Sequence, residues 1–386
     1  MKQTYSFDDV LLVPKYSEIM SRREIDIKSA LSDDISLSVP VISSPMDTVT
    51  EDRMALKLDH LGAMGIIHRY NSIQGQALMV ERCFYGGARN IAAAIGMTGD
   101  YLERATELAK AGANILCIDV AHGHHSMMKT ALQNLKKEFS NEVHLMAGNV
   151  ATLQAFDDLS SWGADSIRVG IGGGSICSTR LVTGHGMPTF QSILECSNTT
   201  YETKIIADGG IKTTGDMVKA LAAGADMVMV GSMLSGTEET PGCIMTKKDG
   251  EKYKEYRGMA SKKAQRSWRG KNSTPEGVAT LVPYKGTVSD IFEDIVASDI
   301  QIGSAFSVAN AVQIDNTEGT IRIAAGSLDA LNQGSGVEAG DTATLASIAL
   351  NFDEDTLKTT NADNTNGALY ESPLEFTITA NQQETV

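Results

Sequence analysis

The chain has 386 residues, of which 33 are basic and 48 acidic, and its formal net charge is −15. This length suits one large domain with a smaller one, and no apolar run reaches the ~18–20 residues of a membrane-spanning helix. An acidic chain without a basic stripe is a poor candidate for nucleic-acid binding. The N-terminus lacks the apolar core of a signal peptide, and the five cysteines have no paired spacing. We therefore expect a cytoplasmic protein that binds neither membrane nor nucleic acid.

Short apolar runs alternate with amphipathic stretches over the first 235 residues. Near-continuous apolar runs are typical of strands buried on both faces of a parallel sheet, and stretches such as 98–111 and 213–223 indicate helices between them. Eight strands with helical crossovers predict a (β/α)8 barrel, and a doubly wound open sheet is the structural rival. The expected strands are 37–46, 62–69, 90–96, 113–120, 142–150, 164–171, 204–211 and 225–232.

Polar and glycine residues follow six of these runs at their C-terminal ends. Any one of them has an ordinary explanation as a helix cap or a turn former. Six in register favour the barrel, because the C-terminal ends of its strands converge on one face and build the active site. The residues are Ser43–Ser44, Asp119, Gly148–Asn149, Gly170–Gly174, Asp208–Gly210 and Gly231–Ser232.

The segment 170–180, GIGGGSICSTR, carries the strongest chemical signal. Consecutive glycines let a backbone approach an ion closely and expose its N–H or C=O groups. Cys177 follows them on a polar strand-end loop, whereas the ordinary expectation for a cysteine is a small buried apolar residue. With Thr179 beside it, Cys177 is a candidate nucleophile.

The last third of the chain departs from the barrel pattern. Residues 236–287 are polar and rich in Lys and Arg, and predict either a mobile flap over the barrel mouth, at about 243–282, or a solvated surface loop. Residues 301–386 carry 12 acidic groups and only Arg322 and Lys358, a net charge of −10. Their short β-prone runs, IQIGSAF, TIRIAAG, ATLASIALNF and LEFTITA, indicate a small antiparallel module. We therefore divide the chain into a catalytic barrel, 1–298, and an acidic β-rich module, 301–386.

Motifs spread over residues 5 to about 292 resemble the IMP dehydrogenase/GMP reductase family. They are SSPMDTVTE (43–51), GIIHR (65–69), AHGH (121–124), AGNVAT (147–152), VGIGGGSICSTR (169–180), IIADGGIKTTGD (205–216), GSMLSGTEETPG (231–242), YRGMAS (256–261), PEGV (275–278) and PYKG (283–286). The resemblance implies a (β/α)8 barrel, usually tetrameric, that performs hydride transfer at C2 of a purine nucleotide. It also implies a nicotinamide cofactor, NADPH or NAD, and a potassium ion.

The resemblance also assigns roles by position. Cys177 would attack C2 to form a covalent thioimidate, and Thr179 and Glu276 would manage the water or the amine. The implied substrate-binding set is Ser44, Met46, Arg168, Ser175, Asp208, Gly209, Gly210, Gly231, Ser232, Tyr256, Gly258 and Met259. The implied cofactor set is Asp119, Ala121, His122, Asn149 and Gly170, and backbone carbonyls of Gly172, Gly174 and Cys177 would hold the potassium ion.

Two departures favour a GMP reductase, which converts GMP to IMP, over an IMP dehydrogenase, which converts IMP to XMP. The regulatory insert of about 120 residues that dehydrogenases usually carry is absent between GIIHR and NIAAAIG. The flap contains Arg266 and Arg269 but no Arg-Tyr pair for activating water. Against these, the wording of SSPMD, AHGH, DGGIK and YRGM is closer to dehydrogenases, so both directions stay open.

The end of the resemblance leaves a third interpretation. In place of the family's Gly-Gly-x-Arg-Ser stretch and closing helix, the chain reads EDIVASDIQIGSAFSVANAVQ, and residues 288–298 are the candidates for a shortened closing helix. The protein could instead be an interaction or particle-associated protein with an inactive barrel, whose module at 301–386 binds a partner that the sequence does not identify.

Overall fold

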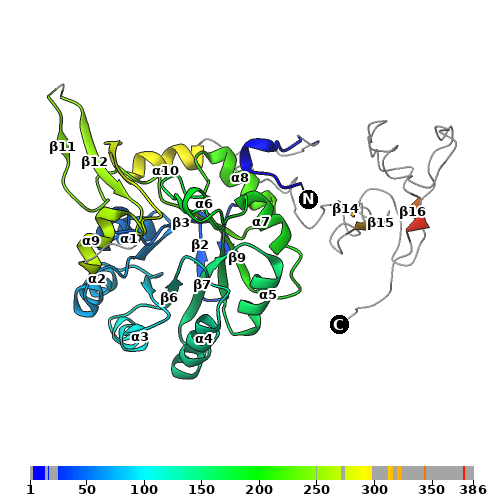
Figure 1. The fold of residues 1–386 in the computed structure, drawn as a ribbon, viewed down its shortest axis with the longest axis horizontal. Coiled ribbons are helices and arrows are strands. Elements are labelled where there is room, and N and C mark those ends of the chain that lie inside the picture. Colours follow the sequence, from blue (N-terminus) through cyan, green and yellow to red (C-terminus); the bar gives the residue numbers. More distant parts are fainter. Residues whose placement is uncertain are drawn as a thin grey trace. The chain divides into compact units, whose positions relative to one another are not determined.

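The computed structural model describes residues 3–13, 16, 25–248, 250–270 and 274–297, and the backbone of four short strands beyond residue 311. The chain divides into two compact units, Met1–Ala305 and Phe306–Val386. The first unit contains a closed barrel of eight parallel strands with helices around it (Figure 1). The second contains two antiparallel pairs, β14 (Val312–Asp315) with β15 (Thr320–Ile323), and β16 (Ala343–Thr344) with β17 (Thr377–Ile378).

All eight expected strands form, each within its expected range, so the barrel is confirmed and the open sheet is excluded. In chain order they are β3 (Val41–Ser43), β4 (Met64–Ile67), β5 (Ala92–Ile95), β6 (Ile115–Asp119), β7 (His144–Val150), β8 (Ser166–Val169), β9 (Lys204–Asp208) and β10 (Met227–Val230). Pairing of β10 with β3, in the register Val228 to Val41, closes the ring.

Two apolar clusters explain why the strands read as continuous apolar runs. In β6, Ile115 and Cys117 belong to the cluster inside the barrel, whereas Leu116 and Ile118 belong to the cluster between the sheet and the helices. This alternation follows from the two-residue period of a strand. The antiparallel pair β1 (Ser29–Ala30) and β2 (Ser36–Leu37) adds Leu37 to the interior cluster. Both faces of the sheet are therefore buried.

Helices follow the strands and bury one apolar face each. They are α1 (Asp52–His60), α2 (Ile73–Tyr85), α3 (Tyr101–Lys110), α4 (Ser126–Phe139), α5 (Leu153–Ser161), α7 (Thr189–Cys196) and α8 (Thr214–Ala222). Side-chain caps fix where several begin: Ser72 accepts from the Gly75 N–H, and Thr213 and Asp216 form a capping box before α8. A 3-10 turn, η1 (Phe7–Asp9), packs Phe7 against Phe190 of α7.

The closing helix that we expected at 288–298 forms as α10 (Val288–Ala297). Val288, Phe292 and Ile295 are buried at the spacing of one helix face, and α10 packs against α1. The β-prone run 300–306 lies outside the described residues, whereas each of the other three expected runs contains a short strand. Among the helices that the structure describes, none has the length and apolar character needed to cross a bilayer.

The segment between β10 and α10 is an ordered flap, not an irregular loop. It consists of the antiparallel sheet β11 (Met245–Thr246), β12 (Lys252–Arg257) and β13 (Ala279–Pro283), with helix α9 (Lys262–Arg269) between the last two strands. In Figure 1, β11 and β12 extend away from the barrel. The buried ammonium of Lys254 anchors the flap because it donates to the carbonyls of Thr237, Glu238 and Thr240. A four-residue helix, α6 (Thr179–Val182), follows the Cys177 loop.

Candidate active site

A cavity of about 490 Å³ opens at the C-terminal ends of the barrel strands, where we expected the active site. Every candidate site residue from the sequence lines it except His122, which is exposed and contacts His124 instead. The lining brings together the loops after β3, β4, β6, β7, β8, β9 and β10 with two parts of the flap, between residues 256 and 265 and between 274 and 277. Residues more than two hundred positions apart in the sequence therefore share one wall.

Cys177, Thr179 and Glu276 form a hydrogen-bonded relay. The Cys177 thiol donates to the Thr179 hydroxyl at 3.2 Å, and that hydroxyl donates to Oε2 of Glu276 at 3.0 Å. Backbone pairing holds the two segments together, since the Ser178 N–H donates to the Glu276 carbonyl and the Val278 N–H donates to the Ile176 carbonyl. A proton can pass along this chain from the thiol to the carboxylate, leaving a nucleophilic thiolate.

The other cysteines show how different Cys177 is. Burial raises the pKa of Cys83 and of Cys196 to about 12, and that of Cys117 to about 11. Those three are buried and follow the ordinary expectation for a cysteine, while Cys177 is half-buried in the cavity wall. Cys243 is exposed on the flap. Cys177 is thus the cysteine whose position suits attack on a bound ligand.

Asp208, at the end of β9, is held by donors on neighbouring strands. Arg168 of β8 donates to its Oδ2 through Nη2 at 2.9 Å and Nε at 3.2 Å, and the Asn149 amide donates to the same oxygen at 2.7 Å. None of the residues described by the structure donates to Oδ1, so that oxygen can accept from a ligand hydroxyl. A fixed carboxylate of this kind suits the ribose of a nucleotide.

Arg168 pairs with two carboxylates in the cavity wall. Its Nη1 donates to Asp119 at 2.8 Å, and its side chain is only 7% exposed. Burial would lower the pKa of the guanidinium, but the neighbouring Cys117, Asp208 and Asp119 outweigh it and raise the pKa well above the usual value. The family resemblance assigned Arg168 to the substrate-binding set. The structure places it in the cavity wall as the group that fixes two acids.

A second region of the wall is rich in hydroxyls and backbone groups. The Tyr256 phenol is buried, which raises its pKa, and a hydrogen bond with Ser175 opposes that rise. A β-carbon at Gly231 would lie 3.2 Å from the Tyr256 hydroxyl and 3.3 Å from Ser44 Oγ, so these groups converge on one point. Gly210, with φ of +83°, and Ser232 complete this region. Hydroxyls and N–H groups without a lysine can cradle a phosphate.

Glycine is required where the Cys177 loop passes the next strand end. A β-carbon at Gly170 would lie 2.0 Å from the Asp208 carbonyl oxygen, and one at Gly209 would lie 3.1 Å from the Gly174 amide nitrogen. Gly170 and Gly209 also have φ of +142° and +93°. The close approach of these two loops is therefore possible only because neither residue carries a side chain.

The structure adds wall residues that the motifs did not single out, chiefly Arg69, Tyr70 and Gln265. The Arg69 guanidinium lies 4.9 Å from the Tyr70 ring centroid and 3.8 Å from Oδ2 of Asp119. Both residues directly follow β4, and their place at a strand end was the available signal. Gln265 lies on α9, whose approach to the barrel no local pattern indicates.

The carbonyl groups that the family resemblance assigns to potassium differ in their hydrogen bonds. Among the described residues, no donor contacts the carbonyls of Gly172 and Cys177, whereas the Gly174 carbonyl accepts from the Cys177 N–H at 3.1 Å. Carbonyl oxygens are ligands of the kind that hard cations prefer. The loop therefore fits a cation but supplies only part of a coordination shell.

The sequence model of the IMP dehydrogenase / GMP reductase domain matches residues 4–329 of this chain. The chain belongs to this family. The match continues past residue 292, where the recognised motifs end, and includes the beginning of the segment that we assigned to the acidic module. The chain is therefore a purine-nucleotide oxidoreductase of the IMP dehydrogenase/GMP reductase family, whose members bind IMP or GMP and use NAD(P)(H).

Relatives of both activities are found. An inosine-5′-monophosphate dehydrogenase from Borreliella burgdorferi is 36% identical over 360 residues, covering 76% of this chain and 87% of its own. A GMP reductase from Leishmania major is 30% identical over 456 residues, covering 80% and 92%. The crystal structure of a GMP reductase from Trypanosoma brucei in complex with guanosine 5′-monophosphate superposes with a TM-score of 0.74 at 28% identity, covering 81% and 93%.

Proposed function

We propose that the protein is a GMP reductase that converts GMP and NADPH to IMP, ammonia and NADP⁺. The observation that carries the proposal is the Cys177–Thr179–Glu276 relay, which joins the Cys177 loop to a flap without an Arg-Tyr pair. A dehydrogenase must hydrolyse its covalent adduct and needs a base for water, which is typically worth ~10²–10⁴ in rate. A reductase has to expel an amine, for which a hydroxyl and a carboxylate are sufficient.

The relay accounts for the protons of this reaction. The Cys177 proton passes through Thr179 to Glu276, and the thiolate attacks C2 of the guanine base. As the bond from C2 to the exocyclic nitrogen breaks, Glu276 returns that proton through Thr179 to the departing amine, which leaves as ammonia. The thioimidate accepts a hydride at C2, and the C2–sulfur bond then breaks to release IMP and the thiolate. The thiolate takes up one proton from solvent, which restores the thiol for the next turnover.

The remaining wall residues have roles in binding. The nicotinamide cofactor, when bound, supplies the hydride, and Asp119, Ala121, Asn149 and Gly170 are the residues that would hold it. Asp208 would accept from the ribose hydroxyls. The phosphate would lie against Ser175, Gly210, Gly231, Ser232 and Tyr256, and the base near Ser44, Met46, Gly258 and Met259. A homotetramer, a cytoplasmic location and a potassium ion at the Cys177 loop belong to the same proposal.

IMP dehydrogenase is the second candidate, and the comparisons supply its support. The dehydrogenase from Borreliella burgdorferi is more similar to this chain than the Leishmania major reductase is. Absence of the regulatory insert does not separate the activities. The alignment with the Leishmania major reductase spans 456 residues, more than the 386 of this chain, so that reductase carries inserted segments. The alignment with the Borreliella burgdorferi dehydrogenase spans 360 residues, fewer than this chain has.

Steady-state assays decide between the two. Purified protein is incubated with GMP and NADPH, and separately with IMP and NAD⁺, while absorbance of the reduced nicotinamide is followed. We expect GMP-dependent consumption of NADPH over many turnovers. Sustained IMP-dependent formation of NADH would overturn the reductase proposal, and no turnover in either direction would favour an inactive barrel. Adding potassium to each assay tests whether the ion is needed.

A further inference from the structure

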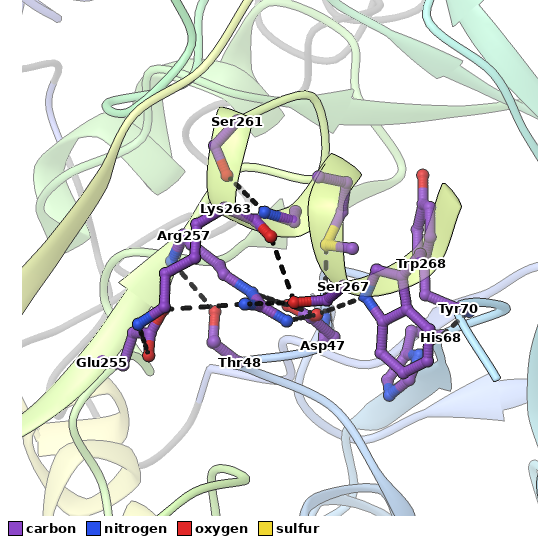
Figure 2. Close-up of polar contacts among 12 residues, drawn as sticks. Asp47, Thr48, His68, Tyr70, Glu255, Arg257, Ser261, Lys263, Ser267 and Trp268 are labelled. Atoms are coloured by element: carbon purple, nitrogen blue, oxygen red, sulfur yellow. Dashed lines mark hydrogen bonds and ion pairs between the residues drawn. The ribbon is translucent and has the colours of Figure 1, made fainter. Parts of the chain in front are cut away.

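The carboxylate of Asp47 joins the barrel to the flap. Asp47 follows the cavity residue Met46 in the loop after β3, and its side chain is only 3% exposed. Both of its oxygens accept from Nε of Arg257 at 3.1 Å, and Oδ2 also accepts from Nη2 of Arg257. The same Oδ2 accepts from the indole N–H of Trp268 at 2.7 Å (Figure 2).

The two donors come from different elements of the flap. Arg257 is the last residue of β12, and Trp268 lies on α9. The Trp268 side chain packs beside the barrel, where its ring centroid lies 6.2 Å from that of His68 and 6.4 Å from that of Tyr70. Because Tyr70 lines the cavity, one end of α9 lies at the cavity rim. Figure 2 shows Trp268 and Arg257 meeting Asp47 from opposite sides.

Residues 258–261, between those two donors, hold Glu276. The Glu276 N–H donates to the Ala260 carbonyl at 3.1 Å, and the Gly258 N–H donates to the Val278 carbonyl at 3.0 Å. The Asp47 N–H also contacts Met259 Sδ at 3.5 Å. Asp47 therefore bonds to residues on both sides of the segment 258–261. That segment carries the backbone hydrogen bond to Glu276, whose carboxylate accepts from Thr179.

We propose that Asp47 is a positioning residue that latches helix α9 onto the barrel and thereby sets the distance between Glu276 and Thr179. The latch has two unequal halves. Arg257 is 12% exposed and has a second acid, Glu255, 3.8 Å away, whereas Trp268 is 42% exposed and donates one hydrogen bond. Release of Trp268 would part α9 from Asp47 and the barrel while Arg257 stays paired, so Trp268 is the half that opens. Helix α9 would stay tied to β12 by the Lys263–Glu255 pair and by the hydrogen bond from Arg257 to Ser267. The proposal rests on the role of Glu276 in the proposed function.

Fluorescence tests the latch without any substrate. The chain has two tryptophans, so Trp162→Phe leaves Trp268 as the sole reporter. In that background we expect Asp47→Asn to shift the Trp268 emission to longer wavelength and to raise its quenching by acrylamide about 2-fold or more. Glu255→Gln is the matched control, because Glu255 contacts Arg257 and Lys263 of α9 without touching Trp268. An Asp47→Asn spectrum equal to that of the control would overturn the latch.

Kinetics then separate positioning from plain stability. With whichever substrate pair is turned over, we expect Asp47→Asn to lower kcat by about 10-fold or more, since misplacing a catalytic group by ~1 Å can cost ~10². KM for the purine nucleotide should change less than 3-fold, and Asp47→Glu should recover part of kcat. Unchanged kcat in Asp47→Asn would overturn the positioning role even if the fluorescence changes. A rise in KM for the nucleotide as large as the fall in kcat would overturn it too.

Trp268→Phe serves if Asp47→Asn does not fold, because it keeps a ring beside His68 and leaves the Asp47–Arg257 pair intact. We expect it to lower kcat about 3-fold or more with the same nucleotide KM. No change in kcat would overturn Trp268 as the opening half. These outcomes can be told apart from failure of the GMP reductase proposal. The fluorescence experiment needs no substrate, and the kinetic experiment uses whichever nucleotide and cofactor the enzyme turns over.

Discussion

Thr179 donates its hydroxyl hydrogen to Glu276 at 3.0 Å, although the two residues lie 97 positions apart and belong to the Cys177 loop and the flap. The hydroxyl also accepts from the Cys177 thiol. One short side chain thus connects the nucleophile to an acid that arrives on a separate structural element. The chemistry of this barrel depends on the flap being in place.

Replacing Cys177 with Ala should abolish turnover and leave nucleotide binding within about 3-fold, because the sulfur forms the covalent bond and the phosphate and ribose contacts come from other residues. Binding is measured by calorimetry with GMP and with IMP. The matched control is Cys243→Ala, since Cys243 is exposed on the flap and outside the cavity lining. Turnover in Cys177→Ala would refute the covalent route.

Breaking the relay should slow the reaction more than it weakens binding. We expect Glu276→Gln and Thr179→Val each to lower kcat by ~10²–10⁴, because the proton loses its path between thiol, carboxylate and amine. Thr179→Ser keeps the hydroxyl and should retain kcat within about 10-fold. A Thr179→Val enzyme as fast as Thr179→Ser would show that the hydroxyl carries no proton.

Asp208→Asn should affect both affinity and stability. We expect KM for the nucleotide to rise by about 10-fold or more, and the free energy of unfolding to fall by about 2–3 kcal/mol, because buried Arg168 loses one of two paired acids. Asp226→Asn is a matched control at the opposite end of the sheet, where Asp226 accepts from the Ile205 N–H. A rise in KM for Asp226→Asn as large as for Asp208→Asn would argue against the ribose role.

The barrel should lose stability as the pH falls from 6.5 towards 4. Burial lowers the pKa of His144 to about 4, whereas in the unfolded chain it is near 6.5, so between these values the unfolded state binds the extra proton. The expected loss from this histidine is about 2 kcal/mol between pH 7 and pH 5. Thermal unfolding at the two pH values checks it. His144→Gln should lose less over that interval, and an equal loss would exclude His144 as the source.

Truncation tests the division of the chain. We expect a protein that ends at residue 329, the end of the family match, to keep kcat within about 2-fold of the full chain. The earlier boundary, with removal of residues 301–386, is also expected to leave activity. If the protein that ends at residue 329 is active and the one that ends at residue 300 is not, residues 301–329 are part of the catalytic domain. Loss of activity in both would assign the acidic segment a role in the barrel.

The strands and their polar ends could be predicted because their signals are local. An apolar run of four residues followed by Asp119, or a glycine cluster before Cys177, is visible in a short window of sequence. The candidate residues taken from the family motifs line one cavity, with a single exception. The exception, His122, belongs to a motif, but the chain turns it to the surface beside His124.

The contacts that could not be predicted are those between distant segments. Nothing near Asp47 indicates that its carboxylate meets Trp268, 221 positions later. Arg168 shows the same limit, because no local pattern indicates that its guanidinium pairs with Asp119 of β6 and Asp208 of β9. Order in the flap also depends on a long-range contact, that of Lys254 with carbonyls after β10.

The pairing of β10 with β3 has a consequence for how the protein is made. The first strand of the barrel leaves the ribosome almost two hundred residues before the strand that covers its edge, and α10 follows only after the whole flap has been synthesised. Until then the nascent chain exposes an open sheet edge and an uncovered apolar face, which are the features that promote aggregation. Synthesis of this protein therefore includes a long interval in which a chaperone has a surface to bind.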